Sequence, residues 1–321
     1  MRAIAIGPYT LKTNVLLAPL SGCSDLAFRL ICREHGAKFC FYEMIDANSL
    51  VHHSRGSDDL LKTTAKDKPI AAQLVGGDAD IMLKAAKILL EKVDIPFLDI
   101  NAACPVKKMI QKFSGANLLR DPKALYKIVK TLASKLDLPI TVKLRIGYNH
   151  VDLKEVTTIA KNCEKNGAAA LFVHGRTRSQ LYAGEINYEA IKAIKHAVKV
   201  PVFGSGNIFS PEMAKKMFDL TDCDGITVAR GAFGNPWIFK QIEKGEAFPV
   251  SLAEKLKVLK KHLSYIEKYK VTRSGYKVGF MRKIAIWYLK GFPEAAKIRA
   301  EVTRLETYEK IIALIDSIII D

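Results

Sequence analysis

Eight short apolar segments alternate with longer amphipathic segments over roughly the first 240 residues, and this alternation restricts the fold more than any other feature. The apolar segments are rich in β-branched residues and lie at 15–18, 39–43, 70–74, 97–101, 140–145, 170–174, 201–205 and 225–229. Apolar residues recur at helical spacing between them, at 79–92, 122–136, 153–166, 188–197 and 211–218. Because parallel strands need long crossovers, the pattern predicts a (β/α)₈ TIM barrel, with a doubly wound open sheet as the alternative.

The pattern changes beyond about Gly245, where helical segments follow without further strands, at 252–270, 276–289, 293–300 and 303–320. We therefore predict two domains, a barrel at 1–244 and a small helical bundle at 245–321. The bundle carries 15 Lys and Arg against 9 Asp and Glu. Its interleaved aromatic residues are Tyr265, Tyr269, Tyr276, Trp287 and Tyr288. This composition suits a surface that contacts phosphates and stacks bases; the alternative is an aromatic core under a solvated lysine face.

The whole chain is strongly basic. Its 321 residues include 50 Lys and Arg against 33 Asp and Glu, for a formal charge of +17. Such a charge favours a polyanionic partner or an anionic membrane surface, unless it only reflects a generally basic proteome. The sequence has no apolar run long enough to span a membrane, and residues 1–11 lack the pattern of a signal peptide. We expect a soluble, cytoplasmic protein.

The six cysteines indicate neither a metal site nor a disulfide framework. They form no Cys-x-x-Cys pair and do not cluster with histidines. We expect most of them to be buried, inert thiols and expect no bound metal.

Polar residues follow the predicted strands, where a barrel of this kind places its active site. The residues at or just after the strand ends are Pro19, Leu20, Ser21, Gln73, Asn101, Cys104, Lys143, Arg145, His174, Arg176, Ser205, Gly206, Asn207, Ala229 and Arg230. Glutamine, lysine, histidine and asparagine at the ends of apolar strands are costly unless something pairs with them.

The loops after the seventh and eighth strands predict a phosphate site. Glycines in 204–207 and 229–231 let backbone N–H groups approach an anion, and Arg230 can make a bidentate contact. The alternative is two ordinary glycine turns with a surface arginine.

Lys143 and Cys104 are the candidate chemical groups. Lys143 lies within an apolar strand, so its ammonium needs an electron-rich ligand or, alternatively, a buried carboxylate such as Asp99 or Glu43. Cys104 follows the fourth strand and precedes Lys107 and Lys108. We expect neighbouring cations to lower its pKa, so that the thiol can give a proton at neutral pH. A structural cysteine beside a turn proline is the alternative.

Seven motifs, in order and at these spacings, resemble the tRNA-dihydrouridine synthase family. They lie at 17–25 (LAPLSGCSD), 73–76 (QLVG), 101–105 (NAACP), 141–145 (TVKLR), 173–177 (VHGRT), 206–208 (GNI) and 229–239 (ARGAFGNPWIF). The helical C-terminus, with Arg282, Lys283 and Trp287, is similar to the tRNA-binding domain of that family. The chain departs from the family pattern at Ala103, Ser205 and Asn207, where glycine, asparagine and aspartate are usual.

The resemblance implies an FMN enzyme that reduces the C5–C6 double bond of a uridine in tRNA, with NADPH or NADH as reductant. It assigns FMN binding to Pro19, Leu20, Ser21, Gln73, Lys143, His174, Ser205, Gly206, Asn207, Ala229 and Arg230. It makes Cys104 the proton donor to C5 of the base. It places Asn101, Arg145, Arg176 and Arg178 near the uracil or its phosphate.

Two other functions stay open at this point. One is an FMN barrel acting on a free small molecule, like dihydroorotate dehydrogenases or ene-reductases. The other is an RNA-binding protein without catalysis, which would need neither Lys143 nor Cys104. The basic C-terminus argues against the first, and bound flavin would exclude the second. We expect a monomer.

Overall fold

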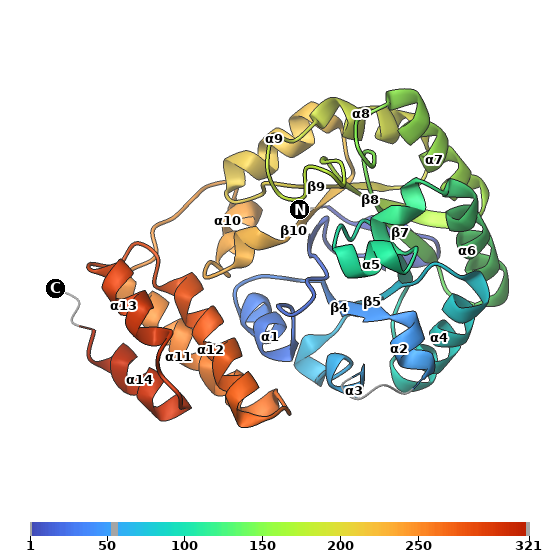
Figure 1. Cartoon of the computed structure of the whole chain (residues 1–321). Coiled ribbons are helices and arrows are strands. Elements are labelled where there is room, and N and C mark those ends of the chain that lie inside the picture. Colours follow the sequence, from blue (N-terminus) through green and yellow to red (C-terminus); the bar gives the residue numbers. More distant parts are fainter. Residues whose placement is uncertain (1, 53–56, 319–321) are drawn as a thin grey trace.

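An eight-stranded parallel barrel forms the centre of the molecule (Figure 1) in the computed structural model, which describes residues 2–52 and 57–318. The strands pair in the order β3-β10-β9-β8-β7-β6-β5-β4. Their bounds are β3 (Val15–Leu17), β4 (Cys40–Asp46), β5 (Ile70–Val75), β6 (Leu98–Ala102), β7 (Ile140–Arg145), β8 (Ala168–His174), β9 (Val202–Ser205) and β10 (Gly225–Val228). The N–H of Leu17 donates to the Phe39 carbonyl at 3.0 Å, which links β3 to the start of β4 and nearly closes the barrel. The predicted TIM barrel is confirmed, and the doubly wound sheet is wrong.

The long helices between the strands cover the outside of the barrel (Figure 1). They are α1 (Leu26–Glu34), α4 (Ala79–Lys92), α6 (Pro122–Lys135), α7 (Leu153–Lys165), α8 (Tyr188–Ala197) and α9 (Pro211–Thr221). Each begins directly after an Asp, Asn or Ser whose side chain accepts a hydrogen bond from the first turn. The shorter helices are α2 (Ala47–Val51), α3 (Ser57–Leu60), α5 (Lys107–Gln111) and α10 (Ile238–Lys244).

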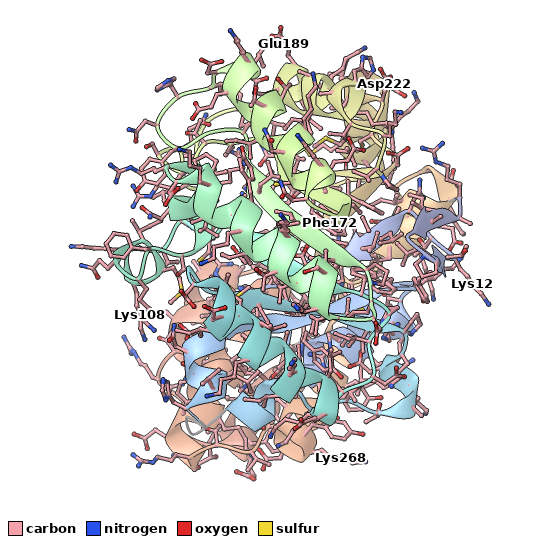
Figure 2. All side chains as sticks on the ribbon, turned by 90° about the vertical axis from the view of Figure 1, so that its right-hand side faces the viewer. Lys12, Lys108, Phe172, Glu189, Asp222 and Lys268 are labelled. Atoms are coloured by element: carbon pink, nitrogen blue, oxygen red, sulfur yellow. The ribbon has the colours of Figure 1, made fainter. Side chains whose placement is uncertain are left out.

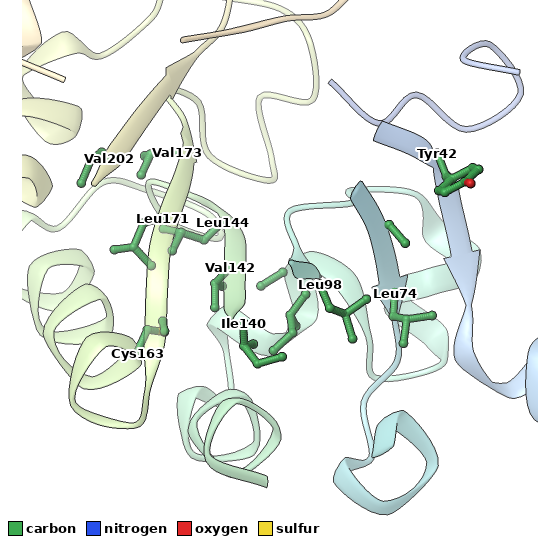
Figure 3. Packing of buried hydrophobic residues seen from close by; sticks show 14 of the residues in the cluster. Tyr42, Leu74, Leu98, Ile140, Val142, Leu144, Cys163, Leu171, Val173 and Val202 are labelled. Atoms are coloured by element: carbon green, nitrogen blue, oxygen red, sulfur yellow. The ribbon is translucent and has the colours of Figure 1, made fainter. Parts of the chain in front are cut away.

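Apolar side chains on the strands pack outward against this helical layer (Figure 3). Leu98, Val142, Leu171 and Val173 are fully buried there.

Stacked aromatic rings fill the amino-terminal end of the barrel interior. Phe39 and Phe97 stack with centroids 5.4 Å apart, and Phe172 stacks on Phe203 at 4.7 Å. A hairpin of β1 (Ile4–Ile6) and β2 (Tyr9–Leu11), which our sequence analysis missed, closes this end beneath the rings. In Figure 2, Phe172 lies near the middle of the molecule, with Lys12 at the hairpin end on the opposite side from Lys108. The interior can therefore open only at the carboxyl ends of the strands.

The C-terminal helices form a bundle with a hydrophobic core of its own. They are α11 (Leu252–Tyr269), α12 (Ser274–Tyr288), α13 (Ala295–Val302) and α14 (Tyr308–Asp316), and they lie beside α1 in Figure 1. The core of the bundle also takes in Ala27 and Ile31 of α1 and Trp237 before α10. The last helix begins five residues later than the sequence predicted, and the predicted end at 320 lies outside the described residues. Among the helices of 2–52 and 57–318, none is both long and apolar enough to cross a membrane.

Candidate active site

A cavity of about 430 Å³ opens at the carboxyl ends of the strands. Most of the residues predicted from strand ends line it: Pro19, Leu20, Ser21, Asn101, Cys104, Lys143, Arg145, His174, Ser205, Gly206, Asn207, Ala229 and Arg230. Gln73 lies fully buried just beneath the cavity, while Arg176 and Arg178 stand outside its lining. The fold therefore gathers residues from six different strand ends around one space.

The loops after β9 and β10 are packed so closely that only glycine fits at two positions. A Cβ on Gly206, whose φ is +129°, would lie 2.3 Å from Ile186 Cδ1. A Cβ on Gly231 would lie 1.9 Å from the Ile208 carbonyl oxygen. The two loops therefore pack closely against each other, and both line the cavity; glycine-containing loops of this kind suit an anionic group approached by backbone N–H donors.

Arg230 supplies a positive charge beside these loops. Its guanidinium lies over the rings of Tyr182, at 5.1 Å, and Phe209, at 5.7 Å. No carboxylate within the described ranges forms an ion pair with it, so the charge is free to meet a ligand. Tyr182 and Phe209 are about half exposed, at 54% and 43%. Both line the cavity, and our sequence analysis missed both because they lie in loops without a periodic pattern.

Lys143 lies on β7 and lines the cavity, and its ammonium makes no direct hydrogen bond or ion pair with residues 2–52 or 57–318. Burial lowers the pKa of its ammonium, and Asp99 partly opposes that shift. Neither Asp99 nor Glu43 forms an ion pair with it in the part of the chain described here; Glu43 accepts a hydrogen bond from the N–H of Gly22 instead. Lys143 thus feels the charge of the buried Asp99 carboxylate without a direct salt bridge to it among the described residues.

His174 is held neutral. Burial keeps the pKa of its imidazole well below the ordinary value, and the nearby charges of Arg145, Lys143, Arg176 and Arg230 act in the same direction. A neutral imidazole can donate from one nitrogen and accept at the other. His174 therefore offers hydrogen bonding, rather than charge, to a ligand in the cavity.

A chain of hydrogen bonds beneath the cavity fixes the loop that carries Cys104. The Asp99 carboxylate accepts from Thr141 Oγ1 and from Gln73 Nε2, both at 2.6 Å. Gln73 Oε1 accepts from Asn101 Nδ2 at 2.7 Å. Asn101 Oδ1 in turn accepts from the N–H groups of Ala103 and Cys104.

This chain of bonds has one direction only. The Asp99 carboxylate accepts at one end and backbone N–H groups donate at the other. Neither the Gln73 nor the Asn101 side-chain amide can therefore flip without losing hydrogen bonds. Residues that the sequence analysis placed on the ligand, Gln73 and Asn101, thus also set the backbone of the Cys104 loop. The sequence named Asp99 only as a possible partner of Lys143, because strand register, rather than sequence spacing, places it beside Gln73 and Thr141.

The pKa of Cys104 corrects one expectation. Burial raises the pKa of this thiol above its ordinary value, while a hydrogen bond from the Val106 backbone and the charge of Arg145 oppose that shift only in part. The predicted lowering by neighbouring cations is wrong because the loss of hydration outweighs them. The thiol therefore stays protonated through neutral pH.

Arg145 is engaged with the protein rather than free. Its guanidinium donates to the carbonyls of Ala103, Thr177 and Leu181 at 2.8 to 2.9 Å and joins the loops after β6 and β8. It borders the cavity and contributes positive charge there.

Arg176 and Arg178 lie further out in the loop after β8. Arg176 donates to the Ala183 carbonyl at 2.8 Å and to Asn207 Oδ1 at 3.0 Å, which ties this loop to the one after β9. The Arg178 guanidinium lies 5.4 Å from the centre of the Tyr148 ring. Within residues 2–52 and 57–318, no group of three His, Cys, Asp or Glu side chains is arranged to hold a metal ion.

Comparisons with known proteins agree with this geometry. Solved structures with a similar fold include the old yellow enzyme from Trypanosoma cruzi, with 10% identity and a TM-score of 0.56 over 78% of this chain and 92% of that one. Morphinone reductase has 14% identity and a TM-score of 0.56 over 77% of this chain and 90% of that one. These likenesses show the barrel fold.

Sequence relatives are much closer. The tRNA-dihydrouridine synthase B of Pseudomonas aeruginosa is 38% identical over 95% of this chain and 92% of that protein. The tRNA-dihydrouridine synthase B of Shewanella oneidensis is 34% identical over 97% of both. A model of the family described as dihydrouridine synthase (Dus) matches residues 16–319. With a family model matching nearly the whole chain and relatives this similar over almost their full length, the chain belongs to the dihydrouridine synthase family.

Proposed function

We propose that this protein is a tRNA-dihydrouridine synthase that uses FMN to reduce the C5–C6 double bond of a uridine in tRNA. The observation that carries the proposal is one cavity lined by Lys143, which has no salt bridge within residues 2–52 and 57–318, by a neutral His174, by two glycine-containing loops with Arg230, and by the Cys104 thiol. Relatives named tRNA-dihydrouridine synthase B, similar along nearly the whole chain, support the same activity.

The cavity residues fit a flavin mononucleotide. The loops after β9 and β10, with Ser205, Gly206, Asn207, Ala229 and Arg230, would hold one phosphate. Lys143 would face the electron-rich edge of the ring system, with Gln73 beneath and His174 beside it, and Pro19, Leu20 and Ser21 would line its other side. A bound flavin would supply the electrons for the reduction.

A nucleic acid fits the mouth of the cavity better than a small free substrate. Tyr182 and Phe209 stand at the rim as exposed aromatic rings, and Phe113 of the same face is 75% exposed. Exposed rings beside Arg230 can stack bases, while the net charge of +17 favours a polyanion. We therefore place tRNA over the mouth and assign residues 245–321 to tRNA binding.

Cys104 acts as the general acid in this proposal. Its raised pKa keeps the proton on sulfur at neutral pH, and the hydrogen bonds of Asn101 to the backbone of residues 103 and 104 hold the thiol at the cavity wall. The proton goes to C5 of the base as C6 is reduced. Asn101, Arg145, Arg176 and Arg178 would hold the base and its phosphates.

Several finer assignments belong to the same proposal. We infer NADPH or NADH as the source of electrons, a cytoplasmic monomer, and a division of the chain near residue 244, where α10 ends before the bundle begins.

Two measurements test the proposed function. Mass spectrometry of the cofactor released from purified protein should identify FMN; finding FAD, or no flavin after reconstitution, would contradict the cofactor assignment. Dihydrouridine should then be mapped by position in tRNA from a strain that lacks this gene, with and without the protein restored. A map that does not change on restoration would exclude the activity.

A further inference from the structure

The loop between β3 and α1, residues 18–25, is held from two different domains. It lines the cavity with Ala18, Pro19, Leu20, Ser21 and Cys23. The N–H of Gly22 donates to the Glu43 carboxylate of the barrel. The carbonyl of the same residue accepts from the Lys283 ammonium of α12 in the bundle. One residue of the loop is thus fixed on both sides, by opposite charges.

Lys283 is itself restrained. Its ammonium lies 4.2 Å from the centre of the Phe280 ring and 5.5 Å from that of Trp287, and it is 3.9 Å from Cys23 Sγ. Two aromatic faces attract the charge and limit the rotamers of a half-buried lysine. These contacts therefore hold the Lys283 ammonium in place against the Gly22 carbonyl.

A second lysine of the bundle reaches the end of the same loop. Lys270, directly after α11, pairs with Asp25 at 3.1 Å, and both side chains are only about one-tenth exposed, at 11% and 12%. Asp25 also accepts from the N–H of Phe28 and so begins α1. The bundle thus holds the loop at its turn and at its exit.

Helix α12 also contacts the loop after β10, the strand next to β3. Trp287 stacks on Phe233 with centroids 3.9 Å apart and planes within 1° of parallel, and Phe233 lines the cavity. A Cβ on Gly234 would lie 2.2 Å from the Trp287 carbonyl oxygen. One helix of the bundle therefore supports both loops that border the same side of the cavity.

We propose that Lys283 is a positioning residue of the active site: by holding the Gly22 carbonyl it fixes the loop that carries Pro19, Leu20 and Ser21. The bundle then completes the flavin site in addition to binding RNA. This inference rests on the proposed function only where it concerns the flavin; the ordering of the loop stands apart from it.

Lys283→Met tests the proposal in the full-length protein, with Lys277→Met as its control. Lys277 is a lysine of the same helix, but its ammonium pairs with Glu267 inside the bundle. Amide hydrogen exchange of residues 18–25 should become about 10-fold faster in Lys283→Met, and its dissociation constant for FMN should rise roughly 10- to 100-fold, as expected when a charged hydrogen bond is lost. Lys277→Met should change neither quantity.

Equal exchange of residues 18–25 in the two variants would overturn the proposal, and so would faster exchange with an unchanged dissociation constant for FMN. If neither the variants nor the parent protein binds FMN, the proposed function fails. The rate of amide hydrogen exchange in residues 18–25 still tests whether Lys283 orders the loop. Should Lys283→Met melt well below the parent protein, Lys283→Gln, which keeps a donor without the charge, gives the same comparison.

Discussion

The backbone of Cys104 is fixed by its hydrogen bond to Asn101, and its thiol stays protonated at neutral pH because burial raises its pKa. Cys104→Ser retains size and hydrogen bonding but replaces the thiol with a far poorer acid. We expect single-turnover reduction of tRNA by pre-reduced enzyme to slow by roughly 10²- to 10⁴-fold, while FMN binding and NADPH oxidation survive. Because burial raises the pKa of the thiol, the parent rate should stay level through neutral pH and fall only in the alkaline range. Loss of FMN from the variant would instead place Cys104 in the cofactor site.

Arg230 lies over two aromatic rings and forms no ion pair with a carboxylate of the described residues, so its removal should affect a ligand rather than the fold. Arg230→Ala should weaken FMN binding by about 2–3 kcal/mol, the loss expected for one partner of a charge-assisted pair. Titration of the apoprotein with FMN measures the change. Arg120→Ala is the control, since Arg120 is an exposed arginine over Tyr148 outside the cavity lining. Equal weakening in both variants would contradict the phosphate assignment.

At the scale of elements, His262 links the stability of the bundle to pH. It lies on α11 and is fully buried against α12 and α1. Burial lowers its pKa to about 4, and the charge of Asp25 opposes this shift only in part. In the unfolded chain the His262 imidazole takes up a proton near pH 6.5, whereas in the folded protein it does so only near pH 4. The free energy of unfolding is therefore highest above pH 6.5 and decreases as the pH falls toward 4. The loss should reach about 3 kcal/mol.

The comparison that isolates this effect uses His262→Gln, which cannot take up the proton. The difference in the free energy of unfolding between parent and variant should shrink as pH falls from 6.5 to 4. A difference that stays constant over that range would show that His262 does not titrate in this way.

The sequence was a good guide to elements and a poor one to their contacts. All eight barrel strands were predicted because short apolar segments alternate with longer amphipathic ones. The two hairpin strands were not, because a tight turn joins them without an amphipathic segment between. Most cavity residues were found because strand ends meet at one face of a barrel. The pairing of Asp99 with Gln73, and of Lys283 with Gly22, depends on register and on tertiary packing that local patterns do not encode.

At the scale of the whole molecule, the core of the bundle includes side chains from the barrel domain. Two independent domains divided near residue 244, as the sequence predicts, would leave flavin chemistry intact when the bundle is removed. Ala27, Ile31 and Trp237 pack into the bundle, and Trp287 and Lys283 support the cavity loops. We now expect the truncated protein to melt at lower temperature and to bind FMN more weakly, besides losing tRNA.

Thermal melting and FMN titration of the truncated chain test this expectation, with salt dependence of tRNA binding as a check on the intact protein. Binding by the intact protein should weaken steeply with salt as counterions are released. A truncated chain that retains parental FMN affinity would show that the two domains are independent.

The aromatic rings and the hairpin close the amino-terminal end of the barrel, so the described part of the chain leaves its interior open at the carboxyl ends of the strands. For the proposed reaction we therefore expect the reductant and the nucleobase to enter by the same route and to exclude each other. Steady-state rates measured at several fixed concentrations of one substrate should therefore give parallel double-reciprocal lines, and each substrate in excess should inhibit competitively against the other. The closed amino-terminal end of the barrel would thus require the reductant to leave before the nucleobase binds.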